Sequence, residues 1–279
     1  MSTPLNDRPS ITLSNGVVMP AIGLGTWPMD DAQATDAVAS AVSIGYRMID
    51  TAENYGNERG VGEGIRRSGL ARDQIFLTTK FNRNWHSIQG PRDACAASLD
   101  RLGLDSIDLL LIHWPNPQHG QYVQAFEGLM RLLEDGTVRA IGTSNFKVTH
   151  LQRLLDTGMQ PHVNQIQLDP YHRRMDIEAM HQARGILTQT WSPLGRGGRM
   201  LEDPAVISAA QRHGRTPAQI VLRWHVQSGF VPIPKSGDPT RQAQNLAIFD
   251  FVLDATEMSA LNGLDRPDPT MLDSDVFGH

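Results

Sequence analysis

Ile107-Asp108-Leu109-Leu110-Leu111-Ile112 is the strongest apolar run in the chain, interrupted only by Asp108, and with the next residue, His113, it predicts a buried strand that ends at an imidazole. The run is far shorter than the roughly 20 apolar residues that a membrane span needs. Helix-like stretches lie on both sides, at Pro91 to Leu102 and Val123 to Asp135, where apolar residues recur every three or four positions. A strand between two such helices is typical of a parallel sheet with crossover helices.

The same alternation continues along the whole chain. Further helices are expected at Asp31 to Ser43, Val148 to Leu155 and Ile177 to Ala183. The other strands are expected at Ala21 to Gly25, Arg47 to Asp50, Ile75 to Lys80, Ala140 to Ser144, Val163 to Gln167, Leu187 to Ser192 and Val231 to Pro234. Eight strands at about 35 residues per unit predict a single α/β domain over residues 1–279, a (β/α)8 TIM barrel. A doubly wound sheet is the alternative, although no linker divides the chain.

Two local patterns mark boundaries. Asn15-Gly16, between Ile11-Thr12-Leu13 and Val17-Val18-Met19, favours a tight turn and predicts an N-terminal β-hairpin. Thr216-Pro217-Ala218-Gln219 has a capping Thr, a Pro at the first helical position and a Gln at the third, which predicts a helix start.

Composition excludes several classes of protein. Lys plus Arg total 25 against 30 for Asp plus Glu, so the formal net charge is -5 and no basic excess favours nucleic acid. The only cysteine, Cys95, lies in a helical pattern and is predicted to be a core thiol. Met1 to Ser10 lacks the apolar segment of a secretion signal, so we expect a cytoplasmic protein that does not bind membranes.

Several common motifs are incomplete. Gly23-Leu24-Gly25-Thr26-Trp27-Pro28 has Pro28 where a dinucleotide fingerprint needs its third glycine, so it does not predict a Rossmann loop. Gly60-Val61-Gly62-Glu63-Gly64 is interpreted as a flexible helix start. The ten histidines form no compact cluster with carboxylates, so no metal site is expected.

Four polar residues follow strands two, three and four, at the end where barrel enzymes hold their active sites. They are Asp50, Tyr55, Lys80 and His113. An ammonium next to a phenol stabilises the phenolate and lowers the phenol pKa. The set therefore suits acid catalysis of carbonyl reduction, with Lys80 beside Tyr55, Asp50 orienting Lys80, and His113 placing the substrate oxygen.

Longer segments carry a family resemblance. Gly45-Tyr46-Arg47-Met48-Ile49-Asp50-Thr51-Ala52-Glu53-Asn54-Tyr55-Gly56-Asn57-Glu58 resembles the first signature of the aldo-keto reductases. Asp108 to Pro115, Gly136 to Phe146 and Ile233-Pro234-Lys235-Ser236 continue the resemblance, which covers essentially the whole chain. Trp191 to Gly197 is most similar to the bacterial branch that includes 2,5-diketo-gluconate reductases.

The resemblance implies a (β/α)8 barrel that binds NADPH without a Rossmann motif. It implies a catalytic tetrad of Asp50, Tyr55, Lys80 and His113, with Tyr55 as the general acid for NADPH-dependent reduction of aldehydes, ketones or α-dicarbonyls. It assigns cofactor binding to Gly25, Thr26, Ser144, Asn145, Gln165, Trp191, Leu194, Gly195, Lys235, Ser236, Arg241, Gln244 and Asn245. Among these, Lys235 and Arg241 match a clamp on the adenosine 2′-phosphate, and Trp191 matches the aromatic residue that stacks on the nicotinamide.

The substrate pocket is expected to have Trp27, Trp114 and Trp85 as walls. Many members have a Trp two residues after the lysine of the tetrad, but this chain has Asn82 there. The short tail from Arg266 to His279 suggests an open, permissive pocket. The expected partner is a small carbonyl compound, and the family implies a monomer.

Two other functions are weighed against a reductase. The first is an NADPH-binding barrel with a redox-sensing or regulatory role and little turnover. The second is a glycosidase that uses a carboxylate pair such as Asp50 with Glu53.

Overall fold

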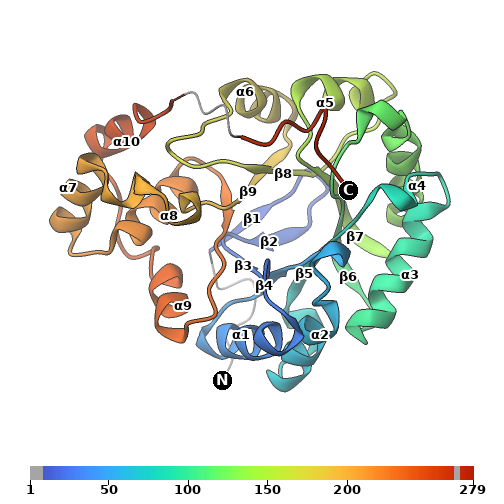
Figure 1. Ribbon diagram of the computed structural model, residues 1–279, viewed down its shortest axis with the longest axis horizontal. Helices are drawn as coiled ribbons and strands as arrows, with labels where there is room; N and C mark the ends of the chain where they lie inside the picture. Colours follow the sequence, from blue (N-terminus) through green and yellow to red (C-terminus); the bar gives the residue numbers. More distant parts are fainter. Residues whose placement is uncertain (1–8, 267–270) are drawn as a thin grey trace.

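Parallel strands form the centre of the molecule (Figure 1). The computed structural model describes residues 9–266 and 271–279, and within these ranges one sheet of eight strands runs in chain order from β3 to β10. The strands are β3 (Leu24–Gly25), β4 (Met48–Asp50), β5 (Phe76–Phe81), β6 (Ile107–Ile112), β7 (Val138–Ser144), β8 (Val163–Gln167), β9 (Leu187–Trp191) and β10 (Val231–Ile233). Each predicted strand is found, with ends that differ by up to three residues.

The first and last strands meet and close the sheet into a barrel. Gly25 forms a parallel bridge with Lys235, and the backbone N–H of Gly23 donates to the carbonyl oxygen of Pro232 at 3.1 Å. A Cβ on Gly23 would lie 2.8 Å from Ile233 Cδ1. The two glycines that resemble a dinucleotide fingerprint therefore allow close packing at this seam.

Helices cover the outside of the barrel (Figure 1). They are α1 (Asp31–Ile44), α2 (Glu58–Arg67), α3 (Gly90–Leu102), α4 (Tyr122–Glu134), α5 (Val148–Leu155), α6 (Met175–Arg184), α7 (Pro204–His213), α8 (Pro217–Gln227), α9 (Pro239–Leu246) and α10 (Ala255–Asn262). Thr216 caps α8 and forms the predicted capping box with Gln219. None of the helices in the described ranges combines the length and the apolar character that a bilayer crossing requires.

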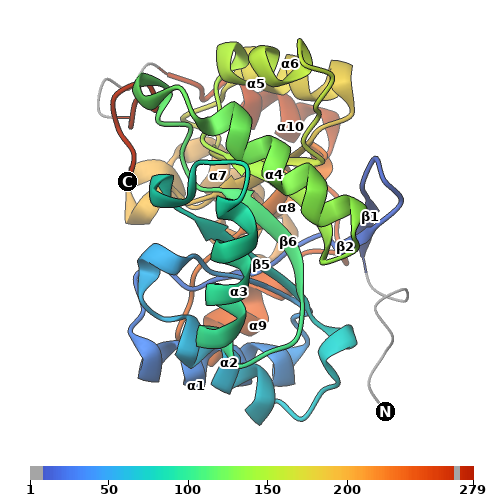
Figure 2. The same cartoon turned by 90° about the vertical axis from the view of Figure 1, so that its right-hand side faces the viewer.

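The predicted N-terminal hairpin covers one end of the barrel. Its strands are β1 (Ser10–Thr12) and β2 (Val18–Pro20), and Gly16 takes a positive φ of 86° in the turn. Leu13 and Met19 belong to the apolar cluster of the barrel interior. Figure 2 shows the hairpin on the opposite side of the molecule from the C-terminal end of the chain.

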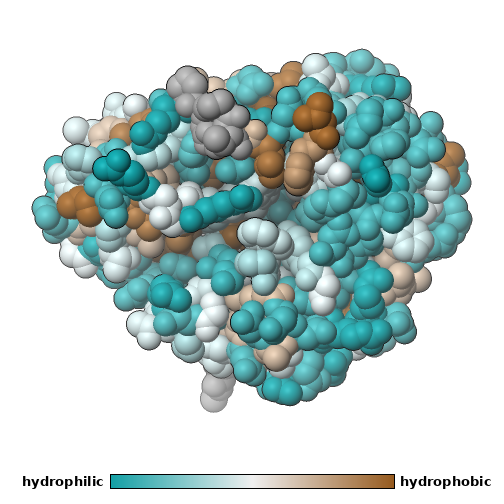
Figure 3. All heavy atoms as spheres, in the orientation of Figure 1, coloured by the Kyte–Doolittle hydropathy of each residue, from teal (hydrophilic) through white to brown (hydrophobic). Residues whose placement is uncertain are grey.

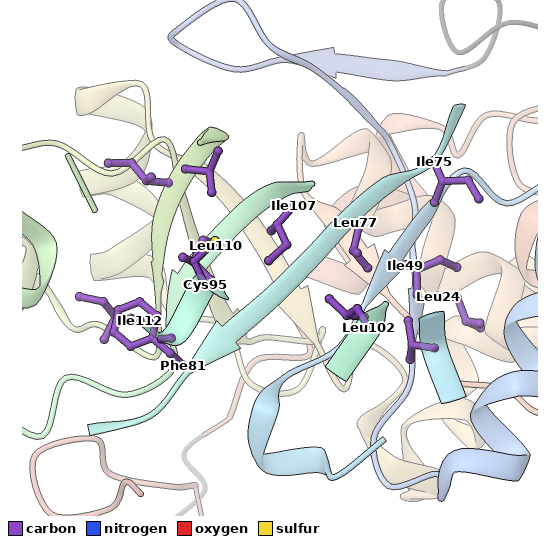
Figure 4. Packing of buried hydrophobic residues seen from close by; sticks show 14 of the residues in the cluster. Leu24, Ile49, Ile75, Leu77, Phe81, Cys95, Leu102, Ile107, Leu110 and Ile112 are labelled. Carbon is purple, nitrogen blue, oxygen red and sulfur yellow. The ribbon is translucent and has the colours of Figure 1, made fainter. Parts of the chain in front are cut away.

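A second apolar layer lies between the strands and the helices. Leu24, Ile49 and Leu77 are paired across three neighbouring strands and lie beside one another in this layer (Figure 4). Cys95 of α3 belongs to the same cluster and is 1% exposed, and burial raises the pKa of its thiol to about 11. The prediction of a core thiol is confirmed.

The glycines at 60, 62 and 64 lie in the first two turns of α2, so the interpretation as a helix start is correct, but these glycines are closely packed and the expected flexibility is wrong. An added Cβ on Gly60 would come 2.1 Å from the carbonyl oxygen of Asp31, and one on Gly62 would come 1.7 Å from that of Leu102. The three glycines are buried because they let α2 approach α1 and α3 closely.

We expect Gly62→Ala to lower the free energy of unfolding by about 1–3 kcal/mol, because the new methyl group would overlap with backbone that cannot move easily. Without this contact, alanine would stabilise a helix interior relative to glycine. Urea unfolding measures the difference. Arg59→Ala on the exposed side of α2 is the control and should have little effect; a Gly62→Ala protein as stable as wild type would contradict the close-packing explanation.

Candidate active site

The four predicted catalytic residues lie at the same end of the barrel. Asp50 ends β4, Lys80 lies near the end of β5, and His113 directly follows β6. Tyr55 ends a 3₁₀ turn, η2 (Glu53–Tyr55), that follows β4. Because the strands are parallel and adjacent, residues far apart in the sequence meet at this edge.

Lys80 connects the acid to the phenol. Its Nζ lies 2.6 Å from Asp50 Oδ1 and 3.4 Å from the hydroxyl of Tyr55, and it also donates to the carbonyl oxygen of Thr51 at 2.9 Å. The Lys80 side chain is completely buried. An ammonium in such a place is stable only with close acceptors, which these three oxygens provide.

The pKa shifts of this group follow from burial and charge. Burial acts to lower the pKa of Lys80, but the Asp50 carboxylate and Tyr55 outweigh it, so the pKa is raised and the amine stays charged. Burial raises the pKa of Tyr55, and the lowering influence of Lys80 does not fully offset it. Lys80 does act to lower the pKa of Tyr55, as expected, but burial outweighs it and the net shift of that pKa is upward. The phenol therefore keeps its proton at neutral pH.

His113 completes the set as a neutral imidazole. Burial first, and then the charges of Lys80 and His279, hold its pKa well below its usual value. Its ring centroid lies 5.7 Å from that of Tyr55, in an edge-to-face arrangement. Its Nδ1 is buried and has no hydrogen-bond partner among the described residues.

A cavity of about 430 Å³ opens above these residues. The face of the molecule drawn in Figure 3 is hollowed near its centre. The cavity is lined by Gly25, Thr26, Trp27, Asp50, Asn54, Tyr55, His113, Trp114, Ser144, Asn145, Gln165, Trp191, Ser192, Arg196, Ile233, Lys235, Leu272, Phe277 and His279. Its size and its mixed polar and aromatic lining suit a small organic ligand.

The residues predicted to hold the nicotinamide lie together on one wall. The indole N–H of Trp191 donates to Asn145 Oδ1 at 2.9 Å, which fixes the ring at the edge of the cavity. Asn145 Nδ2 donates to the carbonyl oxygen of His113, and Ser144 Oγ donates to the backbone oxygen of Gln165. The side-chain amide of Gln165 donates to Asp50 Oδ2 at 2.7 Å, so this wall is hydrogen-bonded to the predicted catalytic residues.

The residues predicted to bind the adenosine 2′-phosphate follow β10. Lys235 lines the cavity, and Arg241 lies in the first turn of α9; both are exposed and make no ion pair within the described part of the chain. Ser236 and Asn245 are buried beside them, and Gln244 is exposed on α9. Two unpaired cations near a helix N-terminus suit a phosphate group.

The remaining predicted cofactor residues lie at the start of the barrel and in the loop after β9. Gly25 and Thr26 line the cavity, and the Thr26 hydroxyl donates to the backbone oxygen of Asp50 at 3.0 Å. Leu194 and Gly195 lie in the loop after β9, where Gly195 has a positive φ of 66°. They do not line the cavity itself, although the neighbouring Arg196 does.

The three predicted pocket tryptophans have different positions. Trp114 is buried, and Trp27 is 51% exposed at the mouth. Both line the cavity. Trp85 does not line it; its indole N–H donates to Glu53 instead, at 2.9 Å. Glu53 is therefore occupied by Trp85, with Asn82 as a further partner.

The C-terminal tail forms part of the cavity wall, where the sequence suggested an open pocket. Leu272, Phe277 and His279 line the cavity, and the Phe277 ring packs edge-on against Trp114 with centroids 4.8 Å apart. Lys147, the residue that caps α5, binds the carboxylates of Asp273 and Asp275 and holds the tail in place. The part of the tail at residues 267–270 lies outside the described residues.

Several lining residues were not singled out from the sequence as site residues. Asn54 precedes the predicted Tyr55, whereas Ser192 and Ile233 lie within predicted strands. Leu272 and His279 have no local sequence signal, because only the tertiary structure brings the tail to the barrel. Arg196 differs from these residues, because it belongs to the segment Trp191 to Gly197 that carries the family resemblance. It lies between two indoles, with its guanidinium carbon 5.1 Å from the Trp191 ring centroid and 5.5 Å from that of Trp27.

The described residues contain no group of three or more His, Cys, Asp or Glu side chains that could hold a metal ion. The polar groups that line the cavity include a carboxylate, a phenol, an imidazole, side-chain amides and the two cations of Arg196 and Lys235.

Solved structures with the same fold include aldo/keto reductases. The enzyme from Brucella melitensis is 42% identical with a TM-score of 0.89, and the match covers 92% of this chain and 100% of that one. A mutant of Gox0644 in complex with NADPH is 42% identical with a TM-score of 0.91, and the match covers 96% of this chain and 97% of that one.

Proteins with similar sequences include aldo-keto reductases as well. Methylglyoxal reductase DkgA of Yersinia pestis is 44% identical over 276 residues, which cover 96% of this chain and 99% of that relative. An aldo-keto reductase of Mycobacterium sp. (strain MCS) is 44% identical over 267 residues, or 94% of each chain. A sequence model described as "Aldo/keto reductase family" matches residues 21–266. The chain belongs to the aldo/keto reductase family.

Proposed function

We propose that this protein reduces aldehydes, ketones or α-dicarbonyl compounds to alcohols with NADPH, and that Tyr55 is the general acid. The observation that carries the proposal is the buried chain from Asp50 through Lys80 to Tyr55 at the base of the cavity. A protonated phenol next to a fixed ammonium can give its proton to a carbonyl oxygen, because the ammonium stabilises the phenolate that remains.

NADP(H) is the cofactor that the cavity suits. When bound, NADPH supplies the hydride for carbonyl reduction. Trp191 offers a flat aromatic face, and Ser144, Asn145 and Gln165 offer hydroxyl and amide groups at the same wall. Lys235 and Arg241 lie further along, where their charges suit the adenosine 2′-phosphate. The NADPH complex of Gox0644, which shares the fold, supports the assignment.

The catalytic residues have separate tasks in this proposal. Asp50 keeps Lys80 charged and in place, and Lys80 supports the loss of the proton from Tyr55. The raised pKa of Tyr55 keeps its hydroxyl protonated at neutral pH, so it can act as a proton donor. His113 is neutral, so it can hydrogen-bond the substrate oxygen without adding a competing acid near Tyr55.

The cavity walls favour compact carbonyl substrates. Trp114 and Phe277 form an apolar side close to His113, and Trp27 borders the mouth. The relatives named methylglyoxal reductases act on a small α-dicarbonyl, which is consistent with this shape. We place α-dicarbonyls and small aldehydes first among the substrates.

The two alternative functions have less support. The aligned Asp50, Lys80, Tyr55 and His113 are the groups that turnover needs, so catalysis is favoured over a purely regulatory barrel. A glycosidase would need Asp50 and Glu53 as a catalytic pair, but Asp50 is bonded to Lys80 and Glu53 to Trp85.

Removal of the Tyr55 hydroxyl tests the proposed acid. We expect Tyr55→Phe to reduce turnover at least about a hundredfold, because only the proton donor is lost. NADPH affinity should stay nearly unchanged. Oxidation of NADPH, followed by its nicotinamide absorbance with methylglyoxal, an aromatic aldehyde, a β-keto ester and 2,5-diketo-gluconate, measures the loss and ranks the substrates.

The matched control is Tyr122→Phe, since Tyr122 packs against Phe146 on the helical layer and does not line the cavity. Turnover retained in Tyr55→Phe would show that another group delivers the proton. Tight NADPH binding by the wild type without turnover on any carbonyl compound would favour the regulatory function.

Cofactor preference tests the phosphate residues. We expect the wild type to bind NADPH more tightly than NADH, and Arg241→Ala to weaken NADPH binding about tenfold while leaving NADH binding unchanged, because NADH lacks the 2′-phosphate. Titration of tryptophan fluorescence gives both dissociation constants. Arg131→Ala, an exposed change on α4, is the control; equal wild-type affinities for the two cofactors would contradict the assignment.

A cytoplasmic location, a monomeric state and a lack of affinity for nucleic acid stay predictions from the sequence. Size-exclusion chromatography with light scattering measures the oligomeric state directly.

A further inference from the structure

A buried polar side chain, Gln189, lies inside the barrel one hydrogen bond away from the amide that binds Asp50. Gln189 is in the middle of β9 and is completely buried. Its neighbours Thr188 and Thr190 bond outward, to His181 of α6 and His225 of α8. Because side chains alternate along a strand, Gln189 points to the barrel interior.

This position is unfavourable for an amide unless the amide is hydrogen-bonded. Barrel interiors are filled mainly by branched apolar residues, and Gln189 is paired in register with Val231 on one side. An unsatisfied buried amide would cost free energy. Among the residues that the structure describes, the acceptor for its own Nε2 is the sulfur of Met48, at 3.6 Å, which is a weak interaction.

The strong bond of Gln189 is to Gln165, its partner across the parallel strands. Gln165 Nε2 donates to Gln189 Oε1 at 2.7 Å and to Asp50 Oδ2 at 2.7 Å. The two N–H groups of the Gln165 amide are therefore both engaged. The carbonyl oxygen of the same amide has no partner among the described residues, and Gln165 borders the cavity.

Gln189 and Asp50 together determine which way the Gln165 amide faces. A glutamine amide rotates easily about its last torsion, and its oxygen and nitrogen ends can exchange places. Here an exchange would turn the carbonyl oxygen toward two oxygen acceptors. The arrangement thus keeps the N–H groups inside the barrel and leaves the oxygen for a donor in the cavity.

We propose that Gln189 is a positioning residue, which orients the Gln165 amide so that its oxygen accepts a hydrogen bond from the nicotinamide carboxamide while its N–H holds Asp50. The inference rests on the proposed function, since it assumes that the nicotinamide occupies this wall. It extends the catalytic group by two residues, from Lys80 and Asp50 through Gln165 to Gln189.

The test compares two ligands in Gln189→Met, which keeps a similar length and flexibility but removes the acceptor. Dissociation constants are measured by fluorescence titration for NADPH and for 2′,5′-ADP, which lacks the nicotinamide. We expect NADPH to bind about three- to tenfold more weakly, the effect of one hydrogen bond, and 2′,5′-ADP to bind as in wild type. Turnover should fall, while the KM for the carbonyl substrate changes little.

Two further variants separate positioning from a structural role. Gln189→Glu retains an oxygen acceptor for Gln165 and should bind NADPH more tightly than Gln189→Met does. Thr190→Val, one residue along the same strand, removes an outward hydroxyl and should not affect either ligand. If Gln189→Met weakens both ligands equally, or weakens neither, the positioning role is wrong.

The outcome is distinguishable from a failure of the proposed function. If wild-type protein does not bind NADPH, or if Tyr55→Phe retains turnover, the proposed function itself fails. If wild-type protein binds NADPH and depends on Tyr55 while Gln189→Met is unchanged in NADPH affinity, only the role of Gln189 is rejected.

Discussion

The buried ion pair between Lys80 and Asp50 is the interaction on which the site depends. Removing an ammonium and a carboxylate from water costs several kcal/mol for each ion, so such a pair persists only where further hydrogen bonds satisfy it. Thr51, Tyr55 and Gln165 provide these bonds. The hydrogen bonds that stabilise these charges also hold a phenol and an amide at the base of the cavity.

The barrel makes this arrangement possible. Asp50, Lys80 and Gln165 come from β4, β5 and β8, and closure of the sheet turns their side chains toward one interior. Closure in turn requires small residues at the seam, where Gly23 and Gly25 lie against Ile233. Backbone contacts at the seam thus determine the distances between the polar side chains of the cavity.

The cavity is completed by segments outside the regular barrel. The tail packs Phe277 on Trp114 and His279 on His113, and Lys147 anchors it through two aspartates. The loop after β9 places Arg196 between Trp27 and Trp191. Both segments therefore contribute to the environment of His113 and Trp191 without belonging to the strands that carry these residues.

The sequence by itself determined the eight strands, the hairpin, the helix cap at Thr216 and the four polar residues at or just after the ends of strands two to four. These features depend on local periodicity, on turn residues and on order along the chain. Only the tertiary structure decided that Trp85 bonds Glu53 outside the cavity, that the glycines of α2 pack against α1 and α3, and that the tail forms a wall. The tertiary structure also decided that the pKa of Tyr55 is raised, since the extent of burial determines whether burial outweighs the charge of Lys80. Such outcomes depend on contacts between distant segments, which local patterns do not encode.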